Sequence, residues 1–194
     1  MPAWAGLVRA ANPGPMTLEG TNSWVLRAAP GVPAVVVDPG PSEAAHLRAL
    51  AERGPIEAVL VTHGHPDHVG GLAEFLALTG TSVRRLSDGV PTELAGLRIT
   101  ALHTPGHTAD SVCYLVEGDG ETAVLTGDTI LGRGTTVVAW PDGDLGDYLA
   151  SLRRLAALTG VPVLPGHGPV LPDCAAAAQA YLAHRQQRLA QVEA

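Results

Sequence analysis

The segment THGHPDHVGG, residues 62–71, places four residues of metal-ligand type within six positions: His63, His65, Asp67 and His68. The apolar run IEAVLVT before the cluster is rich in β-branched residues, as in a buried strand, and the residues after the cluster have helical periodicity. The first two histidines stand two positions apart where the chain leaves the strand, so both can face one ion. The aspartate and the third histidine fall within one helical turn and can face a second ion. The segment therefore predicts a metal site between a strand and a helix.

Three more ligand-type residues stand beside glycine at the ends of predicted strands. They occur in HTPGHT, LTGDT and LPGHG, and they are His107, Asp128 and His167. Each alone is typical of an ordinary turn. Added to the four residues above, these three give seven ligands, enough for two metal ions with positions left for water. Asp128 is the natural bridge, because a carboxylate offers lone pairs in two directions. Nitrogen and oxygen ligands suit zinc, with Mn²⁺ or Fe²⁺ as alternatives, so we expect two Zn²⁺ per chain.

Apolar segments alternate with glycine- and proline-rich turns along most of the chain. Ser42 is the expected N-cap of the first helix, and Gly80 is the expected end of the helix after the histidine cluster. The predicted strands are 23–28, 33–38, 56–62, 97–104, 111–118 and 121–128, with a short strand in VPVLPGHG, and the predicted helices include 42–53, 145–160 and 172–192. This order predicts a single α/β domain over residues 1–194, with mixed sheets covered by helices.

The charge and composition of the chain exclude several classes of function. The net charge is −7 and all twelve basic residues are arginine, so no overall basic field would attract nucleic acid. The N-terminus lacks the long apolar stretch of a signal peptide, and no apolar run is long enough to span a bilayer. The two cysteines form no CxxC pair and predict no disulfide framework. We therefore expect a cytoplasmic protein with no membrane partner, and the sequence gives no indication of its oligomeric state.

The remaining histidines and one cysteine carry weaker signals. His103 lies inside a predicted strand and is expected to be packed or hydrogen-bonded, with a supporting role behind the metal ligands as the alternative. His46 and His184 fall on predicted helices and are expected at the surface. Cys113 lies in an apolar strand and is expected in the core. These residues are therefore left out of the predicted site.

The motifs THGHPDH, HTPGHT, TGD and PGHG, in this order, resemble those of the metallo-β-lactamase superfamily. The match extends over nearly the whole chain. The resemblance implies an α/β fold of the αββα type, a four-layer sandwich of two mixed β-sheets flanked by helices, with the metals at one edge between the sheets. It also implies how the ligands divide: His63, His65 and His107 on one metal, Asp67, His68 and His167 on the other, and Asp128 between the two.

The chemistry that this resemblance implies is metal-assisted hydrolysis. Two zinc ions about 3.5–4 Å apart share a water whose pKa falls toward neutrality, so that a bridging hydroxide is available at pH 7 to attack a carbonyl or phosphoryl centre. The same ions polarise the substrate oxygen and stabilise the developing charge. Asp67 is the predicted catalytic residue, because it can orient the hydroxide and relay its proton. No cofactor besides the metals is expected.

Further motifs point to a substrate. NPGPMTLEGTNSWVL (12–26), LGRGTTVV (131–138), PGHGPV and YLAHRQQR (181–188) resemble the lactamase-β-like endoribonuclease group, so single-stranded RNA is the leading expectation. The resemblance would bring Thr21 and Asn22 near the metals, unless Asn22 only secures its loop. Arg133 and Thr135 would meet an anionic substrate, unless Arg133 is simply a surface residue on a turn. The C-terminal winged-helix-like domain of that group is not found in this sequence, and an acidic, lysine-free chain replaces it poorly.

Two other functions stay open. A hydrolase that resembles glyoxalase II would use the same ligands on a small-molecule ester or thioester, although the glutathione-binding C-terminal region of that family is also not found. The other possibility is a metal-binding protein that keeps the fold but has no catalytic activity. The complete ligand set argues against this possibility. The short segment between Asp128 and His167 leaves no room for the inserted domain of β-CASP nucleases, and His65 in place of glutamate argues against flavodiiron oxidoreductases. The sequence thus predicts a hydrolase.

Overall fold

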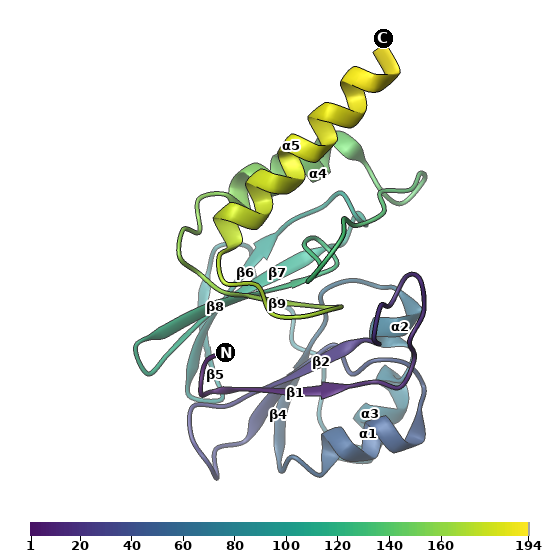
Figure 1. Cartoon of the computed structure of the whole chain (residues 1–194). Coiled ribbons are helices and arrows are strands. Elements are labelled where there is room, and N and C mark those ends of the chain that lie inside the picture. Colours follow the sequence, from purple (N-terminus) through teal and green to yellow (C-terminus); the bar gives the residue numbers. More distant parts are fainter. Residues whose placement is uncertain (194) are drawn as a thin grey trace.

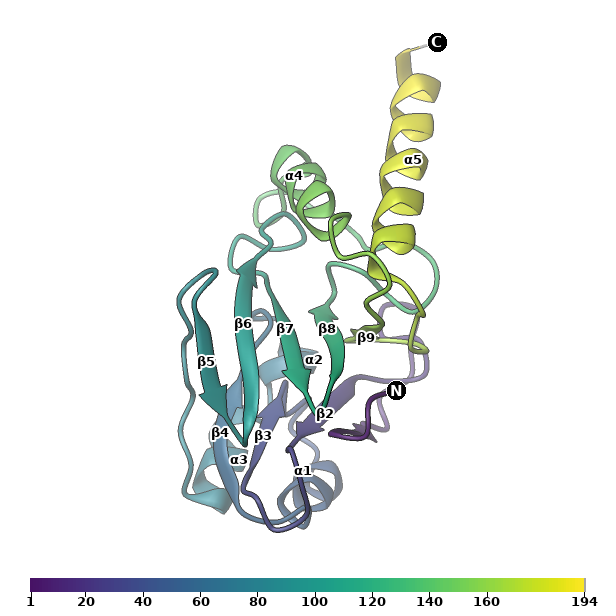
Figure 2. The same cartoon turned by 90° about the vertical axis from the view of Figure 1, so that its left-hand side faces the viewer.

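Two β-sheets lie face to face at the centre of the protein, and helices cover the outer face of each (Figures 1 and 2). This computed structural model describes residues 1–193. The strand order is β1-β2-β3-β4 in the first sheet and β5-β6-β7-β8-β9 in the second. The strands are β1 (Ala5–Arg9), β2 (Asn22–Leu26), β3 (Ala34–Val37), β4 (Ile56–Leu60), β5 (Pro91–Leu94), β6 (Leu97–His103), β7 (Val112–Gly118), β8 (Glu121–Gly127) and β9 (Val163–Pro165). The helices are α1 (Ala44–Ala51), α2 (Pro66–Val69), α3 (Leu72–Thr79), α4 (Leu145–Leu155) and α5 (Cys174–Glu193).

Strand β3 shows why a central strand has a continuous apolar sequence. Successive side chains of a strand point to opposite faces of the sheet. Val35 and Val37 point into the core between the two sheets, whereas Ala34 and Val36 pack beneath α1 and α3. All four side chains are buried. Both faces of the strand therefore remove apolar surface from water, which stabilises the sheet against its neighbours on each side.

A third core lies between the second sheet and the helices α4 and α5. Tyr148, Leu152 and Leu155 follow helical spacing along one side of α4 and are buried against β7, β8 and β9. Ala178 and Tyr181 of α5 complete this core. Among residues 1–193, no helix combines the length and apolar character that a membrane crossing requires.

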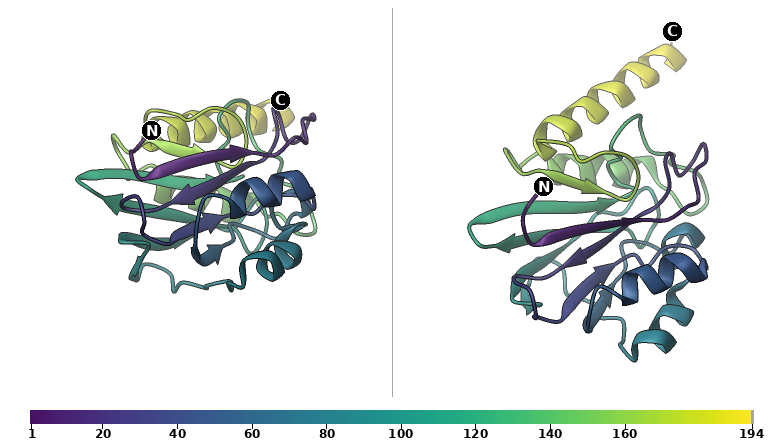
Figure 3. Two further views of the ribbon diagram at one scale, coloured as in Figure 1. Left: turned by 90° about the horizontal axis from the view of Figure 1, so that it is seen from below. Right: turned by 60° about the horizontal axis from the view of Figure 1, so that its bottom comes forward.

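The topology brings several loops to one edge of the sandwich. β3 pairs with β4 in parallel and β8 with β9 in parallel, within otherwise antiparallel sheets. The loops that follow β4, β6, β8 and β9 lie on the same side of the molecule (Figures 1 and 3). Two backbone contacts join the sheets at this edge: an isolated β-bridge between Thr21 and His167, and a 2.8 Å hydrogen bond from the N–H of Asn22 to the carbonyl of Gly166. Residues far apart in the sequence are thereby brought together.

The αββα architecture with two mixed sheets, predicted from the sequence, is confirmed. Gly80 ends α3 in a left-handed conformation with a φ of 68°, as predicted. The predicted helix over 145–160 is shorter and ends at Leu155. Strands β1 and β5 were not predicted. Both are edge strands whose side chains are only partly buried, so their sequences lack the apolar pattern of a central strand.

The prediction that Ser42 caps the first helix is wrong. Helix α1 begins at Ala44, and its N-cap residue Glu43 makes no capping hydrogen bond through its side chain. The hydroxyl of Ser42 instead donates to the carboxylate of Glu74 in α3 at 2.6 Å. A partner on a neighbouring helix thus replaces the local backbone partner that the sequence pattern favours.

The residues outside the predicted site divide between correct and wrong predictions. His46 is buried rather than at the surface, because α1 packs its ring against β2, where Nε2 lies 2.9 Å from the hydroxyl of Ser23. His103 is exposed rather than packed, because it stands at the end of β6. His184 is exposed and Cys113 is in the core, as predicted.

Candidate metal centre

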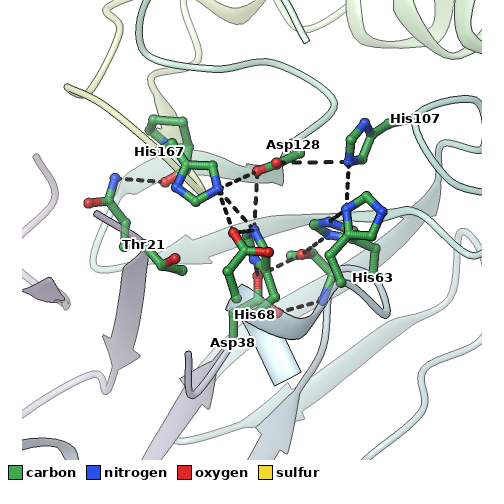
Figure 4. Close-up of polar contacts among 12 residues, drawn as sticks. Thr21, Asp38, His63, His68, His107, Asp128 and His167 are labelled. Atoms are coloured by element: carbon green, nitrogen blue, oxygen red, sulfur yellow. Dashed lines mark hydrogen bonds and ion pairs between the residues drawn. The ribbon is translucent and has the colours of Figure 1, made fainter. Parts of the chain in front are cut away.

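Seven side chains converge at the edge where the loops meet, and Figure 4 shows their surroundings. They come from the loop and short helix after β4, from the β6–β7 connection, from the end of β8 and from the turn after β9. Their ligand atoms form three overlapping groups. Within each group, the ligand atoms all lie within 4.8 Å of one another. The structure thus brings together all the residues that the sequence predicts as metal ligands: His63, His65, Asp67, His68, His107, Asp128 and His167.

The ring nitrogens of His63, His65 and His107 form the first group. Nδ1 of His65 lies 3.0 Å from Nε2 of His63 and 3.1 Å from Nε2 of His107. The outward Nδ1 of His107 donates to the carbonyl of Val137 at 2.7 Å, and the outward Nδ1 of His63 lies 3.1 Å from the hydroxyl of Thr62. A neutral imidazole carries one N–H, so these contacts leave lone pairs on the inner Nε2 atoms. Lone pairs aimed at one point are suited to a cation.

Asp67, His68 and His167 form the second group. Nε2 of His167 lies 3.0 Å from a carboxylate oxygen of Asp67 and 3.2 Å from Nε2 of His68. The outward Nδ1 of His68 faces the carboxylate of Asp38 at 2.8 Å, and the outward Nδ1 of His167 faces the carbonyl of Gly20 at 3.3 Å. The acceptors behind the rings therefore orient both inner nitrogens toward the centre.

Asp128 lies between the two groups, as Figure 4 shows. Its Oδ2 is 3.8 Å from Nε2 of His107, while its Oδ1 is 3.3 Å from Nε2 of His68 and 3.4 Å from Nε2 of His167. Oδ1 is buried and accepts no hydrogen bond from the described residues. A buried carboxylate oxygen without a donor is costly, and a cation would satisfy it. This carboxylate is placed to bridge two ions.

The spacing of the ligand atoms fits two divalent cations. Two ligands of a tetrahedral zinc, each about 2.0–2.1 Å from the metal, lie roughly 3.3–3.4 Å apart. The nitrogen–nitrogen distances in the two groups are 3.0, 3.1 and 3.2 Å. The unsatisfied oxygen of Asp128 and the inward lone pairs also support a cation site. The donor set can therefore hold two metal ions.

Burial and neighbouring charges shift the protonation of the cluster in opposite directions. Burial, followed by the proximity of His68, lowers the pKa of His63 to about 3. Burial also opposes the charge on His68 and His167, but the nearby carboxylates, chiefly Asp128, raise the pKa of His68 well above its usual value and that of His167 to about 9. Burial opposes the charge on Asp128 as well, yet the two histidines keep its pKa well below the usual value. A metal ion would take the place of protons on His68 and His167.

Asp38 supports the centre and was not identified from the sequence. One of its carboxylate oxygens accepts hydrogen bonds from Nδ1 of His68 and, at 2.6 Å, from the hydroxyl of Thr62, and the other accepts the backbone N–H of Thr62 at 2.7 Å. Its φ of 54° is uncommon outside glycine. The sequence feature that could have identified Asp38 is its position in VVVDPG, at the end of a predicted strand.

Thr21 and Asn22, predicted near the metals, are both buried. Thr21 lies beside the turn that follows β9 (Figure 4) and forms a backbone bridge with His167. The side-chain amide of Asn22 donates to the carbonyl of Pro165 at 3.0 Å and to that of Gly168 at 2.9 Å. These hydrogen bonds secure the turn that presents the last histidine of the cluster. The geometry fits the alternative in which Asn22 holds its loop in place.

Arg133 and Thr135, predicted to meet substrate, lie in the loop after β8. The side chain of Arg133 is exposed and forms an ion pair with Glu19, which connects this loop to the loop before β2. Thr135 is half-buried. Both residues therefore lie in the segment that runs from Asp128 to the residues that contact Nδ1 of His107.

A second supporting residue, Arg185 of α5, was also missed from the sequence. Its guanidinium donates to the carbonyl of Thr136 at 2.5 Å and lies over the ring of Tyr148, with Cζ 5.4 Å from the ring centroid. The hydroxyl of Thr136 lies 3.2 Å from Nδ1 of His107, and the next residue, Val137, supplies the carbonyl that this Nδ1 contacts. Helix α5 therefore holds the loop that orients His107.

The comparison with known sequences agrees with this geometry. A family model of the Metallo-beta-lactamase superfamily matches residues 16–92 and 82–167. The chain is 35% identical over 200 residues to the Lactamase-like protein vrtG of Penicillium aethiopicum, covering 94% of this chain and 62% of that protein. It is 34% identical over 204 residues to the Atrochrysone carboxyl ACP thioesterase of Aspergillus fumigatus, covering 95% of this chain and 62% of that protein. The chain therefore spans less than two thirds of the length of each relative.

Solved structures share the fold. The metallo-beta-lactamase family protein TTHA1429 from Thermus thermophilus superposes with a TM-score of 0.79 at 24% identity, covering 97% of this chain and 81% of that one. TTHA1623 in a di-iron-bound form superposes with a TM-score of 0.66 at 28% identity, covering 84% of this chain and 93% of that one. The second structure shows two iron ions in a protein of the same fold.

Proposed function

The chain belongs to the metallo-beta-lactamase superfamily, and on this premise we propose that it is a dinuclear metal hydrolase that cleaves thioesters. The observation that carries the proposal is the pair of ligand groups that face each other across the buried carboxylate of Asp128. The thioester is supported by the relative that is named an ACP thioesterase. This substrate corresponds to the ester or thioester alternative drawn from the sequence.

The two groups would each hold one ion. We propose zinc, because the ligand atoms are histidine nitrogens and carboxylate oxygens, with Fe²⁺ and Mn²⁺ as alternatives. The di-iron form of TTHA1623 supports iron as the first alternative. When bound, two such ions polarise a substrate carbonyl and lower the pKa of a water molecule. The proposed ligands are His63, His65 and His107 for one ion, Asp67, His68 and His167 for the other, and Asp128 for both.

Asp67 is the proposed catalytic residue among the ligands. One of its oxygens faces His167 at 3.0 Å, yet its side chain is 28% exposed, so the carboxylate also reaches the open side of the centre. There it would orient the attacking water and accept its proton. The water oxygen bonds to the thioester carbon, the carbon–sulfur bond breaks, and the sulfur leaves as a thiol after taking up a proton. One water is consumed, and a carboxylic acid and a thiol are formed.

The thioester proposal replaces the single-stranded RNA that the loop motifs favoured. Of the two curated relatives described above, one is named a thioesterase and neither is named a nuclease. The amide of Asn22, part of the motif that suggested RNA, bonds to backbone carbonyls. The chain has a net charge of −7 and no lysine, which weakens attraction to a phosphate backbone. RNA cleavage is kept as an outcome of the test below.

The test is an activity panel on the zinc-loaded protein. It compares acyl thioesters of N-acetylcysteamine with an unstructured RNA oligonucleotide, each with and without chelator. We expect chelator-sensitive thioester hydrolysis, lowered at least about 100-fold in Asp67→Asn because proton transfer to the carboxylate is lost. Glu117→Gln, an exposed carboxylate on β7, is the matched control and should keep full activity. Cleavage of RNA with every thioester intact would overturn the proposal.

A further inference from the structure

Three large apolar side chains are exposed on one short segment beside the metal centre. Trp140 is 88% exposed, Val137 is 47% exposed and Leu145 is 45% exposed, whereas the other two tryptophans, Trp4 and Trp24, are buried. Tryptophan carries the largest apolar surface of any side chain, and exposed apolar surface of this size on one segment is a candidate binding surface. This set is called the apolar rim below.

The apolar rim is anchored at both ends to the loop that carries His107. The carbonyl of Val137 lies 2.7 Å from Nδ1 of His107, and the N–H of Asp144 donates to the carbonyl of Gly106 at 3.0 Å. Trp140 lies between these anchors, three residues after Val137. Three extended residues span at most about 10 Å, so Trp140 stays close to the loop that carries His107.

The acidic charge around the apolar rim disfavours an anionic occupant. The rim is flanked by Asp142, Asp144 and Asp147, all exposed, and residues 134–152 contain no arginine. Aromatic platforms for single-stranded nucleic acid combine stacking with cations that meet the phosphates. Arg185, which lies beside this segment, is instead engaged with the carbonyl of Thr136 and the ring of Tyr148. Three side chains also cover much less than the roughly 800 Å² that each partner buries in a stable protein interface. The occupant that fits is the apolar part of a small molecule.

We propose that the apolar rim is the acyl-binding surface of the enzyme, and that its substrates are thioesters with a long or aromatic apolar acyl group. This inference rests on the proposed function, because it places the acyl group beside the carbonyl carbon that the metal centre attacks. Trp140 is then a specificity-determining residue: its ring packs against the acyl group and removes apolar surface from water.

The experiment compares decanoyl and acetyl thioesters of N-acetylcysteamine on the zinc-loaded protein. Trp140→Ala should lower kcat/KM for the decanoyl thioester about tenfold, since several methylene groups lose their contact, and should leave the acetyl thioester within about twofold. Trp140→Phe should restore most of the decanoyl activity. Leu78→Ala, an exposed apolar residue on α3, is the matched control and should change neither rate. Equal effects of Trp140→Ala on both thioesters, or no effect on either, would overturn the inference.

A binding measurement separates this inference from the proposed function. Trp140 is the exposed tryptophan, so its fluorescence should shift to the blue when the amide analogue of the decanoyl thioester, which is not hydrolysed, is titrated into the zinc-loaded protein. The acetyl analogue should cause no shift. If no thioester is hydrolysed but the decanoyl analogue still shifts the emission, the proposed function fails and the rim stands as an apolar binding site. If thioesters are hydrolysed and neither analogue shifts the emission, the rim assignment fails alone.

Discussion

At the scale of single residues, the metal centre depends on the acceptors behind its ligands. Asp38 faces the outward nitrogen of His68, and the carbonyl of Gly20 faces that of His167. Each contact directs one ring nitrogen away from the centre and the other toward it. Asp38 also carries a charge, so it influences how readily His68 gives up its proton to a metal.

Asp38→Asn should weaken metal binding about 10–100-fold, because the amide offers His68 a weaker acceptor and no charge. Asparagine tolerates a positive φ, so the variant should keep the fold. Competition with a chromophoric chelator measures the affinity, and thermal unfolding checks the fold. Glu117→Gln should bind metal like the unchanged protein. An Asp38→Asn protein with unaltered affinity would show that the carboxylate has no part in metal binding.

Metal affinity should rise with pH up to about 9. The pKa of His167 is raised to about 9, so below this pH its ring carries a proton that must leave before a metal binds. Each displaced proton lowers the apparent affinity about tenfold for each pH unit below the pKa of its ring. His68, whose pKa is also raised, adds a second proton, so the slope approaches about 100-fold for each pH unit. Competition titrations between pH 6 and 8 measure the slope. A pH-independent affinity would contradict the proposed displacement of a proton.

At the scale of elements, helix α5 supports residues 133–138, which contact His107 through a backbone carbonyl and one hydroxyl. Arg185 links the helix to the carbonyl of Thr136, and Thr136 and Val137 both contact Nδ1 of His107. The guanidinium also covers the ring of Tyr148 in α4. Two helices and one loop are thereby connected, and Arg185 acts on the ligand through the loop.

Arg185→Ala should loosen residues 133–138 and weaken metal binding roughly threefold to tenfold, less than a change in a direct partner of a ligand. Hydrogen exchange of this segment and chelator competition measure the two effects. Arg185→Lys should restore part of the affinity, because lysine can still donate to the carbonyl of Thr136. Arg188→Ala, on the exposed part of the same helix, is the control. Faster exchange with unchanged affinity would limit Arg185 to a structural role.

At the scale of the whole molecule, the proposed ligands come from both halves of the sandwich. His63, His65, Asp67 and His68 follow a strand of the first sheet, whereas His107, Asp128 and His167 follow strands of the second. Each ligand group and its bridge include residues from both halves. Metal bound by these ligands would therefore join the two sheets at the edge where Thr21 and His167 already form a backbone bridge.

Removing metal should lower the thermal stability of the whole domain. A ligand at about 100 times its Kd stabilises the folded state by about 2.7 kcal/mol, and in a domain of this size each kcal/mol moves Tm by roughly 2–4 °C. Chelation should therefore lower Tm by roughly 5–10 °C while the far-UV spectrum at 20 °C changes little. Asp128→Asn should lose most of this difference, and His184→Ala should retain it. A Tm that chelation leaves unchanged would contradict metal binding across the two halves.

The local sequence was sufficient to predict the central strands, the helix end at Gly80 and the cluster of ligand-type residues. These features depend on residues close together in the chain: apolar periodicity, backbone freedom at glycine and the chemistry of histidine and aspartate at strand ends. The αββα fold was implied by the resemblance of the motifs to those of the metallo-β-lactamase superfamily. Edge strands β1 and β5 escaped prediction because their side chains are half-buried and carry little pattern.

Long-range packing produced the features that no local pattern contained. Ser42 found a partner in α3 instead of its own helix, and His46 was buried because α1 packs on β2. Asp38 and Arg185 support ligands that lie far from them in the chain, and Trp140 stands out only because the other two tryptophans are buried. The sequence specifies which chemical groups are present at the ends of elements. Their partners, exposure and charge depend on which segments the folded sandwich brings into contact, since these interactions act through space over a few ångströms.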